Sequence, residues 1–444
     1  MFKLKMIALV ILALATSPIT NTLAQTKVLN NASRTTIDNH GALAGHRYRV
    51  VVTSDIGGTD PDDFQSMVHL LLYSDVLDIE GLISSPYGPG RKKDILDVID
   101  HYEKDYPNLK SYSDNYPAPD SLRAITKQGG IDRANYPGFS ESTEGSDWII
   151  KRARADDPRL LYVLVWGGIE DFAQALHDAP DILPKLRVYW IGGPNKKWSP
   201  DAYQYIADHF PKLWIIENNA TYRGWFVGGK QKGQWSNSGF VKEHVAGKGS
   251  LGSFFAKKLG AIKMGDSPSV AWLLKGSPED PSKLGWGGRF VRTWNRPYYH
   301  FKRFTTKEDS MQEFGILEFN LPLGSGVPTN PKARLEVTNQ SLVGYFPGDG
   351  TVRFRFSPKA AVDYDFTIRS NVPSFDGKTG GINAITPSPD LVKEPSPHYP
   401  NWWTDDPDPQ LAEDGHIGVK TVNRWRLDFL KNFAKRLKRC RVPK

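Results

Sequence analysis

Short hydrophobic runs alternate with helical patterns through the first half of the chain. Residues 47–53 (RYRVVVT) read as a buried strand, and residues 63–73 read as a helix rich in aliphatic side chains. Further strand-like runs lie at residues 77–83, 160–166, 186–191 and 213–216, with helical patterns at 95–106, 148–155, 171–177 and 202–209. This alternation predicts an α/β fold, an open and mostly parallel sheet with helices on both faces. Ligands of such folds bind at the carboxyl ends of strands.

The pattern changes after residue 296. Alternating runs at 315–321, 333–338, 351–356 and 364–370, separated by Gly, Pro and Asn turns, predict a small β-sandwich-like module over residues 297–390. The α/β domain then covers residues 47–296. Residues 391–444 form a connector and a C-terminal helix with one apolar face. We expect that helix to pack back on the α/β domain, which would make the β module an insertion.

The first residues resemble a targeting signal. Lys3 and Lys5 precede an apolar run at 6–15, and Thr22-Leu23-Ala24 places small residues at a cleavage site. We expect a signal peptide over 1–24, a linker over 25–46, and export to the periplasm or the extracellular space. The run is shorter than the roughly 20 residues that span a bilayer, so no stable membrane insertion is expected. The single Cys440 excludes a disulfide within the chain but leaves pairing between chains, and a homo-oligomer, open.

The net charge of +8 does not indicate a nucleic-acid partner. Residues 1–24 contribute +2 and the last fourteen residues contribute +7, so subtracting both from +8 leaves −1 for residues 25–430. Because the charges of residues 25–430 nearly cancel, we expect no surface on this part of the chain that binds polyanions. A content of 39% hydrophobic and 24% charged residues also excludes an intrinsically disordered chain.

Four carboxylates follow the first predicted strand within nine residues: Asp55, Asp60, Asp62 and Asp63. Their mutual repulsion is costly unless a cation or hydrogen-bond donors compensate it. A hard divalent cation such as Ca²⁺ or Mg²⁺ is suited to this role, because it binds carboxylate and carbonyl oxygens. The alternative is that Asp60 or Asp62 only caps the following helix.

Several separated motifs resemble a known family. An Asp after a strand, a glycine turn and an Asp-Asp pair opening a helix are similar to the calcium-dependent nucleoside hydrolases. The chain resembles more closely the exported nucleoside hydrolase-like family whose name carries a cellulose-binding label, over about residues 47–295. The motifs are DIGG (55–58), PDD (61–63), QSMVHLLLYS (65–74), DIEGLI (78–83), VWGG (165–168), IGGPN (191–195), GDSPS (265–269) and WGGR (286–289).

The resemblance implies a nucleoside hydrolase type of sheet and a calcium site. Asp55 and Asp63 would bind Ca²⁺ together with Asp266 from a distant loop, and the backbone carbonyl of Trp166 would be a further ligand. All four groups offer the oxygen atoms that Ca²⁺ prefers.

The resemblance also implies catalytic roles. Asp55 would be the general base that takes a proton from the attacking water, and the cation would lower the pKa of that water. Asp62 would face a sugar hydroxyl. Asp60 is the alternative for this position, because the turn is two residues longer than in the hydrolases and the register is open.

The chain also departs from the nucleoside hydrolases. Residues 84–87 (SSPY) replace an Asn that binds ribose, and Asn195 is the only plausible remnant of the ribose-binding loop. Gly265 stands where some hydrolases have a His that protonates the leaving base. These departures favour a different glycosyl substrate over an ordinary nucleoside.

Four more residues are candidates for substrate binding, each with a structural alternative. Glu217 and Asn219 follow a predicted strand and would approach the same crevice, or lie on an edge loop. Trp402 and Trp403 would stack on a sugar at the pocket rim, or pack between the two modules.

Two functions remain after these steps. The first is an exported Ca²⁺-dependent hydrolase of a glycosyl bond, N-glycosyl by analogy, in which an activated water attacks the anomeric carbon. The second is a non-catalytic protein that binds plant cell-wall polysaccharide. In both cases the expected partner is a sugar-containing small molecule or a polysaccharide, and not a nucleic acid.

Overall fold

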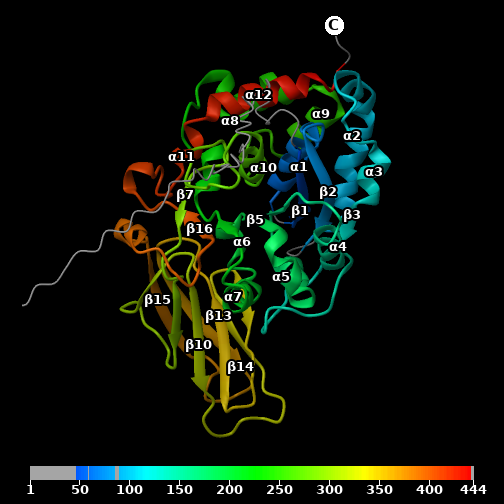
Figure 1. The fold of residues 1–444 in the computed structure, drawn as a ribbon. Coiled ribbons are helices and arrows are strands. Elements are labelled where there is room, and N and C mark those ends of the chain that lie inside the picture. Colours follow the sequence, from blue (N-terminus) through cyan, green and yellow to red (C-terminus); the bar gives the residue numbers. More distant parts are fainter. Residues whose placement is uncertain (1–46, 59, 86–89, 442–444) are drawn as a thin grey trace, which may run out of the picture. The chain divides into compact units, whose positions relative to one another are not determined.

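The computed structural model describes residues 47–58, 60–85 and 90–441. The predicted signal peptide and the linker up to residue 46 lie outside the described residues. The largest element is an eight-stranded sheet with the order β3-β2-β1-β4-β5-β6-β16-β7 (Figure 1). All of its neighbouring strands are parallel except β16 and β7. The predicted fold class, an open and mostly parallel sheet with helices, is confirmed.

The strands of this sheet are short and buried, as is typical of parallel sheets that helices cover on both faces. Alternate side chains of β1 enter different cores: Val50 and Val52 lie in one hydrophobic cluster, and Val51 in the other. The strands are β1 (Tyr48–Ser54), β2 (Leu77–Ser84), β3 (Thr126–Gln128), β4 (Leu161–Val165), β5 (Leu186–Trp190), β6 (Ile215–Glu217), β7 (Phe290–Arg292) and β16 (Trp402–Asp405).

Helices cover both faces of the sheet. One core contains side chains of α1 (Asp62–Leu72), α2 (Lys92–Tyr112), α9 (Gly249–Leu259), α10 (Ser267–Leu274) and α12 (Arg426–Lys438). The other contains side chains of α4 (Glu144–Ala153), α5 (Glu170–Asp178) and α7 (Pro200–His209). Short helices are α3 (Pro119–Ala124), α6 (Gly192–Asn195), α8 (Asn237–Phe240) and α11 (Lys420–Asn423). Among the described helices, none has the length and hydrophobicity to cross a membrane.

The β-rich segment folds as two small sheets around one core, which is a β-sandwich. A three-stranded sheet has the order β13-β10-β8, and a five-stranded sheet has the order β12-β11-β14-β15-β9. Both sheets contribute to a single hydrophobic cluster, for example with Phe354 and Ile368. The strands are β8 (Tyr298–Phe301), β9 (Ser310–Gln312), β10 (Ile316–Pro322), β11 (Ala333–Val337), β12 (Gln340–Val343), β13 (Thr351–Phe356), β14 (Asp363–Ser370) and β15 (Thr379–Ile385).

The chain returns to the α/β core after the β-sandwich. Strand β16 enters the large sheet between β6 and β7. Helix α12 then packs against α1 and α9, and its Leu430, Phe433 and Leu437 are fully buried in the same core (Figure 1). Arg436 of α12 forms a buried ion pair with Asp75.

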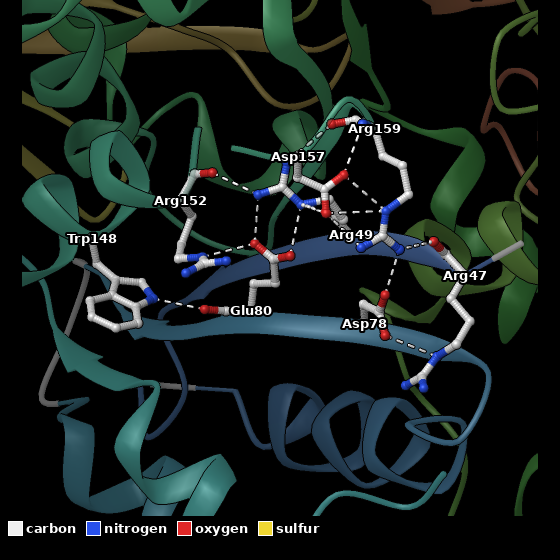
Figure 2. A network of polar contacts seen from close by, with 8 residues as sticks. All are labelled: Arg47, Arg49, Asp78, Glu80, Trp148, Arg152, Asp157 and Arg159. Atoms are coloured by element: carbon white, nitrogen blue, oxygen red, sulfur yellow. Dashed lines mark hydrogen bonds and ion pairs between the residues drawn. The ribbon is translucent and has the colours of Figure 1, made fainter. Parts of the chain in front are cut away.

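A network of charged side chains lies near the amino ends of β1 and β2 (Figure 2). The pairing of β1 with β2 skips Glu80, which is the bulged residue. The Glu80 carboxylate accepts hydrogen bonds from Arg49 at 2.7 Å and from Arg152 at 2.8 Å. The Arg49 side chain is only 1% exposed, so Glu80 supplies the charge that its burial requires. Trp148 donates to the Glu80 carbonyl at 2.7 Å.

Candidate functional site

The candidate site lies where the strand order of the large sheet reverses. Strands β2 and β4 flank β1, so the loops after β1 and β4 leave the sheet toward opposite sides and open a crevice between them. Asp55 follows β1 directly, and Trp166 follows β4 directly. Both residues line a cavity of about 270 Å³.

The acidic segment after β1 begins as a tight turn and ends as a helix. Gly57 has a φ of +85°, which favours glycine, and the Gly58 N–H donates to the Asp55 carbonyl at 2.9 Å. Helix α1 begins at Asp62, whose N–H donates to Asp60 Oδ1 at 3.4 Å. Asp60 also forms an ion pair with Lys263. Asp60 therefore makes a weak capping hydrogen bond at the start of α1, and its charge is paired with the Lys263 ammonium group.

Asp62 and Asp63 meet Asp266 inside the cavity. One carboxylate oxygen from each of the three lies within 4.8 Å of the other two, and all three side chains are buried. Asp55 borders Asp63 on the same side of the cavity. Burial, and then the charge of the neighbouring carboxylates, raises the pKa of Asp55, Asp62, Asp63 and Asp266.

Helix α1 holds the distant Asp266 loop in place. Gln65 Oε1 accepts hydrogen bonds from the backbone N–H of Lys263 at 2.9 Å and of Met264 at 3.2 Å. Ser66 Oγ accepts from the Asp266 N–H at 3.3 Å. The residue types that follow Asp62 and Asp63 in the helix thus position the third carboxylate, about 200 positions later in the chain.

Gly265 brings the loop close to Asp62. Its N–H donates to Asp62 Oδ2 at 3.1 Å. A Cβ at this position would lie 2.4 Å from the same oxygen, closer than real Cβ contacts. A side chain at residue 265 is therefore incompatible with the observed position of Asp62.

Trp166 is fixed between β1 and the Asp266 loop. Its N–H donates to the Thr53 carbonyl at 2.8 Å, and its indole N–H donates to Ser269 Oγ at 2.8 Å. Ser269 Oγ in turn donates to the Asp266 carbonyl at 2.7 Å. The two sides of the acidic group are therefore joined by hydrogen bonds as well as by packing.

The acidic group fits a bound divalent cation. The cavity concentrates buried carboxylates, and Asp266 Oδ2 is buried without a hydrogen-bond partner among the described residues. Such an orphaned oxygen is costly unless a ligand compensates it. An all-oxygen set of this kind is typical of Ca²⁺ or Mg²⁺ sites.

Basic and amide side chains also line the cavity. Lys197 and Asn195 come from the segment after β5, Lys263 from the loop before α10, and Asn339 and Lys359 from the β-sandwich. Tyr222 also lines the cavity, and burial raises its pKa to about 12, which keeps its hydroxyl neutral.

The basic residues of the cavity were not predicted from the sequence. They come from three segments that are far apart in the chain. One signal was present: Lys196-Lys197-Trp198 follows a Gly-Gly turn at the carboxyl end of a predicted strand, where ligands bind.

Asn195 lines the cavity, as the resemblance implied, although its amide donates to the Ile191 carbonyl at 2.9 Å. Glu217 does not line it. The Glu217 carboxylate is buried and pairs with Lys196 at 2.6 Å, and it accepts a hydrogen bond from Tyr203. Asn219 does not line the cavity either, and its side-chain amide donates to the Glu217 carbonyl at 3.4 Å and to Thr404 Oγ1 at 3.3 Å.

Trp402 and Trp403 are not at the pocket rim either. Trp402 is fully buried in the core that also contains Val51. Trp403 is partly buried against the core that contains Val50 and Val52. The physical reason is strand pairing: both residues belong to β16, which is hydrogen-bonded on both edges. The Trp402 ring belongs to a core of the sheet, and neither ring lines the cavity.

Solved structures that are similar to this chain include three whose sequence identity to it is low. A nucleoside hydrolase-related protein from Saccharophagus degradans that is associated with carbohydrate metabolism shares 18% identity, with a TM-score of 0.47, over 77% of this chain and 100% of that chain. A plant nucleoside hydrolase shares 14% (TM-score 0.36, 56% and 82% covered). An inosine-uridine preferring nucleoside hydrolase from Bacillus anthracis shares 11% (TM-score 0.34, 78% and 97% covered).

A search of curated proteins gave no match. Residues 49–290, more than half of the chain, match the sequence model of one family. The matched segment begins in β1 and ends at β7, so it contains Asp55, Asp62, Asp63 and Asp266. The chain belongs to the family described as cellulose-binding Sde182, nucleoside hydrolase-like domain.

Proposed function

We propose that the protein is a Ca²⁺-dependent hydrolase that cleaves a glycosyl bond, N-glycosyl by analogy. The observation that carries the proposal is the Asp266 carboxylate: its Oδ2 is buried without a hydrogen-bond partner among the described residues, and one of its oxygens lies within 4.8 Å of carboxylate oxygens of Asp62 and Asp63. Asp55, Asp63 and Asp266 would hold the cation, with the Trp166 carbonyl. When bound, the cation would lower the pKa of the attacking water.

The residues of the chain then divide the remaining tasks. Asp55 takes a proton from the water as the water oxygen bonds to the anomeric carbon; the glycosyl bond breaks, and the leaving group departs with the bonding electrons and takes a proton from solvent. Asp62 accepts a hydrogen bond from a sugar hydroxyl, and the Gly265 N–H keeps its carboxylate in place. Asp60 is less suited to this task, because it is paired with Lys263. Ile191, Trp166 and Tyr222 add apolar and aromatic surface to the lining of the cavity.

Turnover tests the proposal directly. The purified chain is incubated with a panel of nucleosides and plant cell-wall oligosaccharides, in Ca²⁺ or in a chelator, and new reducing ends are measured. We expect product only with Ca²⁺, and none from an Asp55→Asn variant that still binds Ca²⁺. An Asp157→Asn variant is a control, because Asp157 lies in the network at the other end of β1.

A second candidate function is carbohydrate binding without turnover. It is favoured by the lining of the cavity, because no described lining residue is a His that would protonate a leaving group. Absence of product across the panel, together with saturable sugar binding, would decide for this candidate.

We also propose that the protein is exported. The proposal rests on the charged and apolar pattern of residues 1–24. Amino-terminal sequencing of the protein from its native host should begin at Gln25. A mature protein that still begins at Met1 would contradict export by a cleaved signal.

A further inference from the structure

The Lys197 side chain is buried in the wall of the cavity without an acidic partner. It is 8% exposed and lines the same cavity as the carboxylates. No described residue forms an ion pair or a side-chain hydrogen bond with it. Its ammonium nitrogen lies over the Trp198 ring, 4.0 Å from the ring centroid. A buried ammonium group is costly without an anion.

The neighbouring Lys196 provides a direct contrast. Its ammonium group is also buried, and it pairs with Glu217 at 2.6 Å and donates to the Phe314 carbonyl at 3.2 Å. The fold thus compensates one of two adjacent buried lysines and leaves the other facing the cavity.

Lys197 is held in this position from both sides. The β11–β12 hairpin of the β-sandwich reaches the cavity, and Gln340 donates a hydrogen bond to the Lys197 carbonyl at 2.5 Å. The next turn of chain is anchored by Ser199, which donates to Glu170 at 2.8 Å. The position of the ammonium group is therefore built into the fold.

Further positive charge surrounds Lys197. Lys359 lines the cavity and has no ion pair with a described residue, whereas Lys263 is paired with Asp60. Burial, together with repulsion from Lys359 and Arg133, lowers the pKa of Lys197 to about 8. Uncompensated cations near each other disfavour the empty cavity and favour an anion between them.

We propose that the sugar ligand of this cavity carries an anionic group, a sugar-acid carboxylate or a phosphate ester, which Lys197 and Lys359 bind. This inference rests on the proposed function in one respect, that the cavity binds a sugar. It adds a substrate class, because a neutral glucan leaves Lys197 uncompensated.

The carboxylates of Asp55, Asp62, Asp63 and Asp266 line the same cavity as Lys197. These carboxylates repel an anionic group and Lys197 attracts it, so the anionic group would lie at Lys197 and the sugar hydroxyls would face the carboxylates.

Binding measurements test the proposal. The full mature chain with saturating Ca²⁺ is titrated with a neutral cello-oligosaccharide, an oligogalacturonate of the same length, and glucose 6-phosphate. We expect at least one acidic ligand to bind about tenfold or more tightly than the neutral one, and its affinity to fall with added salt. The two acidic ligands distinguish a carboxylate from a phosphate.

Variants assign the effect to the lysines. Lys197→Met should remove the preference for the acidic ligand, Lys197→Arg should retain most of it, and Lys359→Gln should weaken it. Lys302→Gln is the matched control, an exposed lysine of the same β-sandwich that does not line the cavity. Equal affinity for acidic and neutral sugars would overturn this inference alone. Absence of any sugar binding would overturn the proposed function as well.

Thermal unfolding gives a readout that needs no ligand. Lys197→Met removes an uncompensated buried charge, so Tm should stay equal or rise. Lys196→Met leaves Glu217 buried without its partner, so Tm should fall. A marked fall in Tm for Lys197→Met would show that Lys197 has an internal partner and would contradict the proposal.

Discussion

At the scale of single residues, the position of Asp266 is set by atoms that are not themselves acidic. Ser66 and Gln65 bind its loop through backbone N–H groups, and Gly265 leaves no side chain between the loop and Asp62. Four carboxylates raise one another's pKa in this space. Their repulsion destabilises the folded state, and a bound cation would offset this effect.

Asp266→Asn should weaken Ca²⁺ binding by about tenfold or more, because a charged oxygen ligand becomes neutral. Isothermal titration calorimetry of the chelator-treated protein measures the change. Asp60→Asn is the matched control, since Asp60 pairs with Lys263 and is outside the group of three carboxylates. Unchanged affinity for Asp266→Asn would remove Asp266 from the metal site.

Gly265→Ala should also weaken Ca²⁺ binding while every carboxylate remains. The new Cβ meets Asp62 Oδ2, so either the loop or the Asp62 side chain must move. Gly260→Ala at the end of α9 meets no atom within 4 Å and has a φ of +68°, so it controls for backbone strain without contact at the site. If both variants bind Ca²⁺ equally well, close packing at Gly265 is not needed.

The carboxylates of the site that lie close together in the sequence could be predicted from it. Asp55, Asp62 and Asp63 stand within nine residues after a strand, so their meeting follows from the turn. Asp266 was reached only through a family resemblance. Lys197 and Lys359 were not predicted, because two modules bring them together and no spacing in the sequence encodes that contact.

At the scale of elements, β16 joins segments that are far apart in the chain. Asp405 at its end accepts hydrogen bonds from three consecutive backbone N–H groups, those of Asn219, Ala220 and Thr221. These bonds hold the segment after β6, where Tyr222 enters the cavity. The strand thus stabilises the sheet and one side of the site.

Trp402→Ala should lower the free energy of unfolding by about 3–5 kcal/mol, because the indole is fully buried. Urea unfolding followed by circular dichroism measures the loss. Trp402→Phe keeps most of the packing and should bind sugar as the parent does. A Trp402→Phe variant that is stable but no longer binds sugar would show that Trp402 takes part in ligand binding.

The strands that were predicted are continuous hydrophobic runs such as residues 161–165, which are buried on both faces. Strand β16 was missed for a physical reason: its sequence is WWTD, four residues with an acid and no aliphatic side chain. Its pairing depends on the existing edge of β6, so tertiary context determines its structure.

At the scale of the whole molecule, two groups of charged side chains lie toward opposite ends of strand β1. The acidic group lies after the carboxyl end of β1, and the ionic network of Arg49, Glu80 and Arg152 lies nearer its amino end. Burial acts to raise the pKa of Glu80, but its hydrogen bonds to Arg49 and Arg152 outweigh burial, and the pKa is lowered.

This lowered pKa predicts how stability depends on pH. Glu80 contributes stability above its unfolded pKa, near 4.3, and the contribution is lost as the pH falls through its lower folded pKa. Glu80→Gln should therefore be less stable than the parent at pH 7, and the difference should shrink on acidification below about pH 4. Urea unfolding across this range measures it.

Glu103→Gln is the matched control, because Glu103 pairs with Arg123 in a more exposed position. Its difference from the parent should be small throughout. A Glu80→Gln difference that stays constant down to pH 2 would contradict the assigned ionic role.

The late entry of β16 has a consequence for synthesis of the protein. While the ribosome is still translating the β-sandwich, the nascent chain presents the edge of β6 without its partner strand. The sheet is complete only after residue 405 has emerged, and the core only after α12 has followed. We therefore expect the α/β core to reach its native state only after residue 438 has emerged, and chains truncated before β16 to aggregate or be degraded.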